Sequence, residues 1–179
     1  MRIINNNKAN NNKAKKKIKP EYRNRHKARE LAVQFLYSLD NNLKINNDFE
    51  KSFELFFDLV AYEEITITDE AMISEIKDYC KYLAQGTWNA KYKIDEILLR
   101  AVTGWRPDSM NAVDLAILRL AIFESFLDKK LEFKAAISEA TSIAQVFGAE
   151  KSPRFIHGVL AKIYEYLNLT NERSELKSE

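Results

Sequence analysis

The sequence predicts an all-α protein, and three observations carry that prediction. The chain has 179 residues, which is the size of a single domain. It contains only four glycines and three prolines, too few for the many tight turns of an all-β sandwich or barrel. Apolar residues recur every three or four positions along most of the chain, as in helices with one buried face. We therefore expect a single-domain bundle of about seven helices over residues 21–169, followed by a charged tail at 170–179.

The first half of the domain is expected to contain three helices. The first helix is predicted over residues 25–40, where apolar side chains follow the helical period. Asp48 can cap a second helix, because its side chain can accept a hydrogen bond from a free backbone N–H group. A third helix is expected to end at Gly86. The predicted buried face of the second helix consists of Phe49, Phe53, Phe56 and Val60.

A fourth helix is predicted over residues 89–103, with Gly104 in the left-handed conformation that often follows a helix end. The next helix, over residues 110–128, is apolar almost all round. Such a helix belongs in the middle of a bundle. Asp108 or Ser109 is expected to cap it.

A sixth helix is predicted over residues 133–147, with Gly148 as its end. Ser152 is expected to cap the last helix, and Pro153 suits the first helical position. Gly158 lies inside this last helix, where glycine costs about 1 kcal/mol relative to alanine. This glycine suggests the close approach of a neighbouring helix.

Several classes of function are disfavoured by what the sequence lacks. It has no glycine-rich nucleotide loop, no nucleophile elbow and no H-E-x-x-H motif, so we expect no cofactor, no metal and no enzymatic activity. The single cysteine, Cys80, is interpreted as a buried small hydrophobic residue. No apolar run is long enough to span a membrane, and the first residues do not form a secretory signal. We expect a cytoplasmic protein.

The charge of the chain is unevenly distributed. Residues 1–34 hold eleven Lys and Arg against two Glu, a net charge of 11 − 2 = +9, while the whole chain has +2, which leaves −7 for the rest. Clustered cations favour a polyanionic partner, because they release counterions from its phosphates. Residues 1–20 are rich in Asn and Lys and nearly lack apolar side chains, so we expect a disordered arm there. The alternative is that this arm only increases solubility.

Side chains suited to nucleic acid lie along the first helix. Lys and Arg can bind phosphates, an amide can hydrogen-bond a base edge, and a tyrosine ring can stack on an unpaired base. Stacking of this kind contributes about 1–3 kcal/mol per base. These first candidates are Arg23, Arg25, His26, Lys27, Arg29, Gln34 and Tyr37.

A second group of candidates lies at the start of the last helix. The free backbone N–H groups and the positive dipole end of a helix suit a phosphate, and cationic side chains add to this effect. A charged helix start that is merely solvated is the alternative. The candidates are Lys151, Ser152, Arg154 and Phe155. We expect both groups to lie on one face of the bundle.

Three blocks of sequence resemble the NusB family in their order and spacing. They are KARELAVQFLY at residues 27–37, VDLAILRLAIFE at 113–124, and AAISEATSIAQVFGAE at 135–150, which is followed by KSPRFIHGVL. The resemblance covers about residues 23–167. It implies an all-helical bundle of two small subdomains and a non-enzymatic RNA-binding adaptor of transcription antitermination.

The resemblance also implies partners and roles. NusB-like proteins pair with a ribosomal protein called NusE in this role, bind single-stranded boxA RNA of ribosomal RNA leader transcripts, and help RNA polymerase resist termination. Apart from Arg23, it assigns both candidate groups to the RNA track. It assigns Asp108, Asp114 and Arg119 to the side that faces NusE. Alternatively, Asp114 and Arg119 form a polar stripe that faces solvent. His26 stands where arginine is common, and with an ordinary pKa it would be neutral at pH 7.

Two other functions remain open at this point. A NusB-like domain also forms the amino-terminal part of some ribosomal RNA cytosine methyltransferases, so the chain could be a fragment of such an enzyme. A helical bundle of this kind can also self-associate as a homodimer that buries the RNA face. Gel filtration with light scattering separates the second of these from the adaptor.

Overall fold

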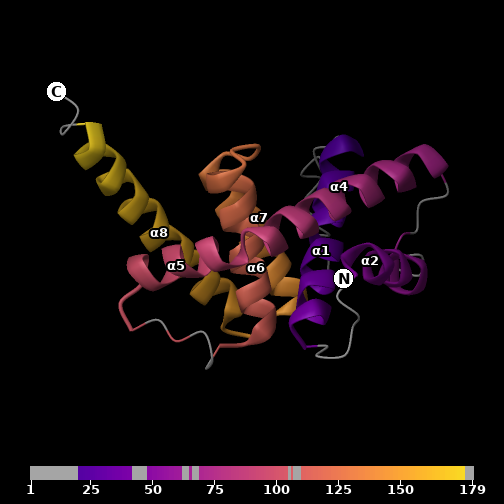
Figure 1. Cartoon of the computed structure of the whole chain (residues 1–179), viewed down its shortest axis with the longest axis horizontal. Helices are drawn as coiled ribbons and strands as arrows, with labels where there is room; N and C mark the ends of the chain where they lie inside the picture. Colours follow the sequence, from indigo (N-terminus) through magenta and orange to yellow (C-terminus); the bar gives the residue numbers. More distant parts are fainter. Residues whose placement is uncertain are drawn as a thin grey trace, which may run out of the picture.

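The computed structural model describes residues 20–41, 48–61, 65, 69–104, 106 and 110–175. Nearly all of the arm at 1–20 and the candidate Asp108 lie outside these residues. Within them the chain forms seven α-helices and two π-helical segments, which confirms the predicted fold class (Figure 1). The elements are α1 (Pro20–Asn41), α2 (Phe49–Phe56), η1 (Phe57–Ala61), α4 (Glu70–Asn89), α5 (Lys91–Ala101), α6 (Ala112–Ile122), η3 (Phe123–Leu127), α7 (Phe133–Phe147) and α8 (Ser152–Glu175).

Helix α6 lies in the middle of the bundle, as its apolar sequence predicts. It contacts α1, α4, α5, α7 and α8, and every residue from 116 to 122 is buried. Figure 1 shows α1, α2 and α4 on one side of α6 and α5, α7 and α8 on the other. A single cluster of buried side chains runs through both groups, so α6 joins them into one core.

An aromatic cluster fixes α2 against α1. The ring of Phe35 lies 5.3 Å from that of Phe49, 5.2 Å from that of Phe53 and 5.1 Å from that of Phe56, measured between centroids. The first two contacts are edge-to-face, with ring planes 81° and 84° apart, and such contacts stabilise a core beyond the area that they bury. The side chain of Asp48 accepts a hydrogen bond from the backbone N–H of Lys51, so the predicted cap of α2 is confirmed. Phe49, Phe53 and Phe56 pack into the core as predicted, while the side chain of Val60 lies outside the described residues.

Several helix boundaries differ from the predictions. Helix α4 continues through Gly86 to Asn89, because this glycine accommodates a neighbouring ring instead of ending the helix. The N-cap of α6 is Asn111, whose side chain accepts from the N–H of Val113, so the cap expected at Asp108 or Ser109 is wrong. Helix α8 extends to Glu175, well into the expected tail. Gly104 has the predicted left-handed conformation, with φ +75°.

Two glycines inside helices differ in their surroundings, and their substitutions should have opposite effects. A Cβ atom at Gly86 would overlap the ring of Phe123, whereas nothing lies within 4 Å of the position of a Cβ at Gly158. The close approach expected at Gly158 is therefore wrong. We expect Gly86→Ala to lower the free energy of unfolding by about 1–3 kcal/mol through overpacking. Gly158→Ala should raise it by about 0.5–1 kcal/mol, since alanine favours the helix. Urea unfolding of both variants measures the two changes. If the free energy of unfolding changes in the same direction in both variants, the prediction is contradicted.

Candidate nucleic-acid interface

The first candidate group lies on α1, but only part of it is exposed. Arg23 and Arg25 are exposed, and the ring of Tyr37 is 42% exposed. Gln34 and Lys27 are partly buried, and the Lys27 Nζ lies 3.2 Å from a carboxylate oxygen of Glu30. These side chains extend from a helix of 22 residues, which is about 33 Å long at 1.5 Å per residue.

Arg29 is part of the core, so the prediction that it contacts RNA is wrong for this structure. Its side chain is buried, with 3% of the residue exposed. Its Nε and one terminal nitrogen donate to the two carboxylate oxygens of Glu124 at 2.8 and 2.7 Å. The other terminal nitrogen donates to Glu139 at 3.3 Å. The planar guanidinium fits a carboxylate with two parallel hydrogen bonds, and this geometry uses it to join α1 to η3 and α7.

His26 is also held by acidic neighbours. Its Nδ1 lies 2.8 Å from an oxygen of Glu139, and its Nε2 lies 3.4 Å from an oxygen of Glu30. Hydrogen bonds first to Glu139 and then to Glu30 raise the pKa of His26 to about 9. His26 is therefore charged at pH 7, and the expectation of a neutral ring is wrong. The exposed Tyr22 donates its hydroxyl to the same Glu139, so this carboxylate holds the amino-terminal half of α1.

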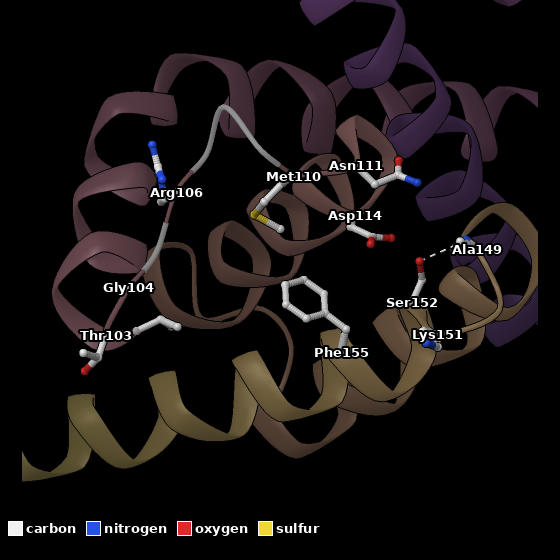
Figure 2. A pocket seen from close by; sticks show the side chains of 11 residues that line it. Thr103, Gly104, Arg106, Met110, Asn111, Asp114, Ala149, Lys151, Ser152 and Phe155 are labelled. Atoms are coloured by element: carbon white, nitrogen blue, oxygen red, sulfur yellow. Dashed lines mark hydrogen bonds between the residues drawn. The ribbon is translucent and has the colours of Figure 1, made fainter.

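The second candidate group lies beside a cavity of about 520 Å³ between the start of α8, the start of α6 and the end of α5 (Figure 2). Lys151, Ser152 and Phe155 line it, and the ring of Phe155 is 41% exposed. Arg154 is exposed beside the cavity but does not line it. The buried hydroxyl of Ser152 accepts from the N–H of Ala149 at 2.9 Å. It therefore stabilises the turn before α8 and is not the predicted cap.

The two described candidates for the partner-facing side have different environments. Asp114 lines the cavity, is only 7% exposed, and its Oδ1 accepts no hydrogen bond from the described residues. Figure 2 shows its carboxylate between Asn111 and Ser152. Arg119 is buried, donates to both oxygens of Asp95 at 2.8 Å, and lies 2.5 Å from Asp40. Arg119 therefore joins α1, α5 and α6, and neither residue lies on the solvent-facing stripe that was the alternative.

The structure brings the candidates from α6 and α8 together, but it does not bring those from α1 into the same cavity. None of the α1 candidates lines the 520 Å³ cavity. That α1 and α8 share one face for RNA stays a prediction. Within the described residues, no three His, Cys, Asp or Glu side chains are grouped as a metal site would require, and no helix is long and apolar enough to cross a membrane.

The carboxylates that hold α1 were missed by sequence reasoning. Glu124 and Glu139 are buried on otherwise apolar helix faces, and Tyr79 donates its hydroxyl to Glu124. Burial and then this hydrogen bond raise the pKa of Tyr79. A glutamate on an apolar face is a signal of a buried ion pair, because such a charge is rarely buried without a partner. The sequence does not say which cation pairs with it.

Comparisons with known proteins agree on one family. The model of the NusB family matches residues 26–165. The transcription antitermination protein NusB of Carboxydothermus hydrogenoformans is 34% identical over 145 residues, which cover 81% of this chain and 95% of that protein. That of Chloroflexus aggregans is 34% identical over 141 residues, which cover 78% and 85%.

The fold agrees with solved structures as well. A crystal structure of antitermination factors NusB and NusE in complex with dsRNA superposes with a TM-score of 0.63 and covers 80% of this chain and 98% of that chain. At 24% identity, this likeness concerns the fold alone. The family match and the two curated relatives extend over most of the sequence. This chain belongs to the NusB family.

Proposed function

We propose that this protein is a non-enzymatic transcription antitermination adaptor that binds single-stranded boxA RNA together with NusE and helps RNA polymerase resist termination. Its curated relatives are named transcription antitermination proteins, and a structural neighbour was solved with NusE and dsRNA. The RNA contacts in this proposal come from the exposed candidates on α1 and at the start of α8. The cavity that contains Asp114 faces NusE.

The exposure of two aromatic rings, one of them beside exposed cations, is the observation that carries the RNA part. Tyr37 on α1 and Phe155 on α8 are both more than 40% exposed. Arg154 and Lys151 are exposed next to Phe155 in the sequence. A ring that is half exposed gains little from the core, but it can stack on an unpaired base while the cations bind the adjacent phosphates.

The carboxylate of Asp114 supports the NusE part. A buried acceptor without a donor costs about 1–3 kcal/mol, and an N–H group from a partner would remove this cost. The cavity around Asp114 is open enough to accept a side chain, and Met110 and Phe155 add apolar surface to its wall. A basic side chain of a docked protein suits this combination.

A filter-binding titration tests the proposal. Labelled boxA RNA and a strand with the same composition in scrambled order are each titrated with the protein, with and without NusE. We expect tight binding of boxA only when NusE is present, and much weaker binding of the scrambled strand. Equal affinity for the two strands in the presence of NusE would contradict the proposal.

A further inference from the structure

A second groove lies between α1, α4 and the turn before α7, away from the Asp114 cavity. Its volume is about 310 Å³, at the lower end of the range for small-ligand sites. Asn24 and Arg25 come from α1, and Lys130 comes from the turn. Helix α4 supplies one wall through residues spaced by three and four positions, which are Glu75, Asp78, Tyr79 and Tyr82.

The α4 wall presents flat aromatic surfaces with cations over them. The rings of Tyr79 and Tyr82 are nearly parallel, with planes 14° apart and centroids separated by 6.2 Å. The Lys130 Nζ lies 3.7 Å from the centroid of Tyr82, and the guanidinium carbon of Arg25 lies 5.3 Å from that of Tyr79. About half of each of these two cationic side chains is exposed. Long exposed side chains can turn toward a phosphate, which leaves the ring of Tyr82 to a stacked base. The ring of Tyr79 forms the side of the groove and keeps the buried Arg29 guanidinium 5.8 Å from its centroid.

Beside its two cations and two tyrosines, the groove presents acceptor oxygens from three residues, Asn24, Glu75 and Asp78. Asn24 is 2% exposed and donates its amide to Glu75 at 3.1 Å, which orients its carbonyl oxygen away from that carboxylate. This Oδ1 accepts no hydrogen bond from the described residues. Glu75 and Asp78 add two exposed carboxylates. The groove therefore suits a group that presents several N–H donors.

We propose that this groove binds a guanine nucleotide of a single-stranded RNA. Guanine carries adjacent N1–H and N2–H donors, which match the two oxygens of one carboxylate, and its flat ring suits the tyrosines. Its phosphate suits Arg25 and Lys130. A cationic peptide side chain would also match the carboxylates, but those two cations would repel it. The inference rests on the proposed RNA-binding function and adds a base-reading site on α4.

The test uses guanosine 5′-monophosphate as the probe, with adenosine and inosine 5′-monophosphates as comparisons, in an NMR titration of the full chain. Inosine keeps N1–H and lacks the N2 amine. We expect the guanine nucleotide to shift the signals of Tyr79, Tyr82 and Lys130, with affinity at least about tenfold above that for the other two, as is typical of a paired hydrogen-bond contact. Equal binding of all three nucleotides, or no shift at these residues, would overturn the proposal.

Substitutions of residues that line the groove test whether the selective binding of the guanine nucleotide takes place there. Asp78→Asn should remove the preference for the guanosine nucleotide over the inosine nucleotide. Lys130→Ala should weaken the binding of all three nucleotides. Glu96→Gln, an exposed carboxylate on α5, is the matched control and should change nothing. Thermal melts establish that each variant is folded. A preference for guanine that survives in a folded Asp78→Asn variant, or N-acetylarginine amide shifting these residues when the nucleotide does not, would reject the guanine site.

The experiments distinguish a failure of the groove proposal from a failure of the adaptor proposal. If boxA RNA binds with NusE but the guanine nucleotide shows no selectivity, only the groove proposal fails. If the nucleotide occupies the groove but boxA is not distinguished from a scrambled strand, the adaptor proposal fails.

Discussion

Replacing Glu124 with alanine is expected to lower the free energy of unfolding by about 3–5 kcal/mol, a large part of the stability of a domain of this size. Glu124 is almost completely buried and accepts two hydrogen bonds from Arg29 and one from Tyr79. Without it, the Arg29 guanidinium stays buried with only Glu139 as an acidic partner at 3.3 Å. Urea unfolding followed by circular dichroism measures the loss.

Two further variants control this result. Glu96→Ala removes an exposed pair with Arg100 at 2.6 Å and should change the free energy of unfolding by less than about 0.5 kcal/mol. The double variant Arg29→Met with Glu124→Leu should be more stable than Glu124→Ala alone, because no charge is left buried without a partner. A loss below about 1 kcal/mol for Glu124→Ala would show that this ion pair does not anchor α1.

Removing the exposed cations of both candidate groups should weaken RNA binding strongly and leave the fold intact. The variant replaces Arg23, Arg25, Lys151 and Arg154 with alanine, all of which are exposed. If each contacts a phosphate, the slope of log affinity against log salt should fall by about 0.7 for each contact to a single strand. We expect a loss of affinity for boxA with NusE of about 100-fold at physiological salt, measured by filter binding at several salt concentrations.

A variant with the same change in net charge provides the control. Lys93, Arg100, Lys134 and Lys162 are also exposed, and none belongs to either candidate group. Their replacement by alanine should leave the salt slope nearly unchanged. If the two quadruple variants lose the same affinity, the general charge of the protein explains the effect and the proposed track is wrong. Arg29 is unsuitable for this experiment because its replacement would destabilise the core.

The sequence predicted the helices well because most of them bury one face and α6 is buried almost all round. The apolar composition of α6 and the spacing of the phenylalanines of α2 could be read from the sequence alone, and the structure confirms both. The prediction that a helix ends at Gly86 was wrong. In a sequence, a glycine is equally typical of a helix end and of a position where another residue packs closely against the helix. Phe123 lies 37 positions away, and only the fold brings it against this glycine.

The candidate site was harder to predict for a related reason. Arg25 and Arg29 are both cations on one helix, separated by a single turn, yet one is exposed and the other is buried against Glu124. Sequence spacing shows which residues share a face of one helix. It does not show which of these faces packs against a buried carboxylate of another helix. The raised pKa of His26 has the same origin, because Glu139 is 113 residues away in the chain.

The ion pairs of Arg119 connect the regions that the proposed function assigns to NusE and to RNA. Through Asp40 and Asp95, this one guanidinium connects the last turns of α1 with the middle of α5. Asp114 lies a little more than one turn earlier on the same helix, and Tyr37 lies three residues before Asp40. Under the proposed function, NusE docks beside Asp114 and a base stacks on Tyr37, so the ion pairs of Arg119 would link these two contacts. By thermodynamic reciprocity, whatever one ligand gains from this linkage the other gains equally.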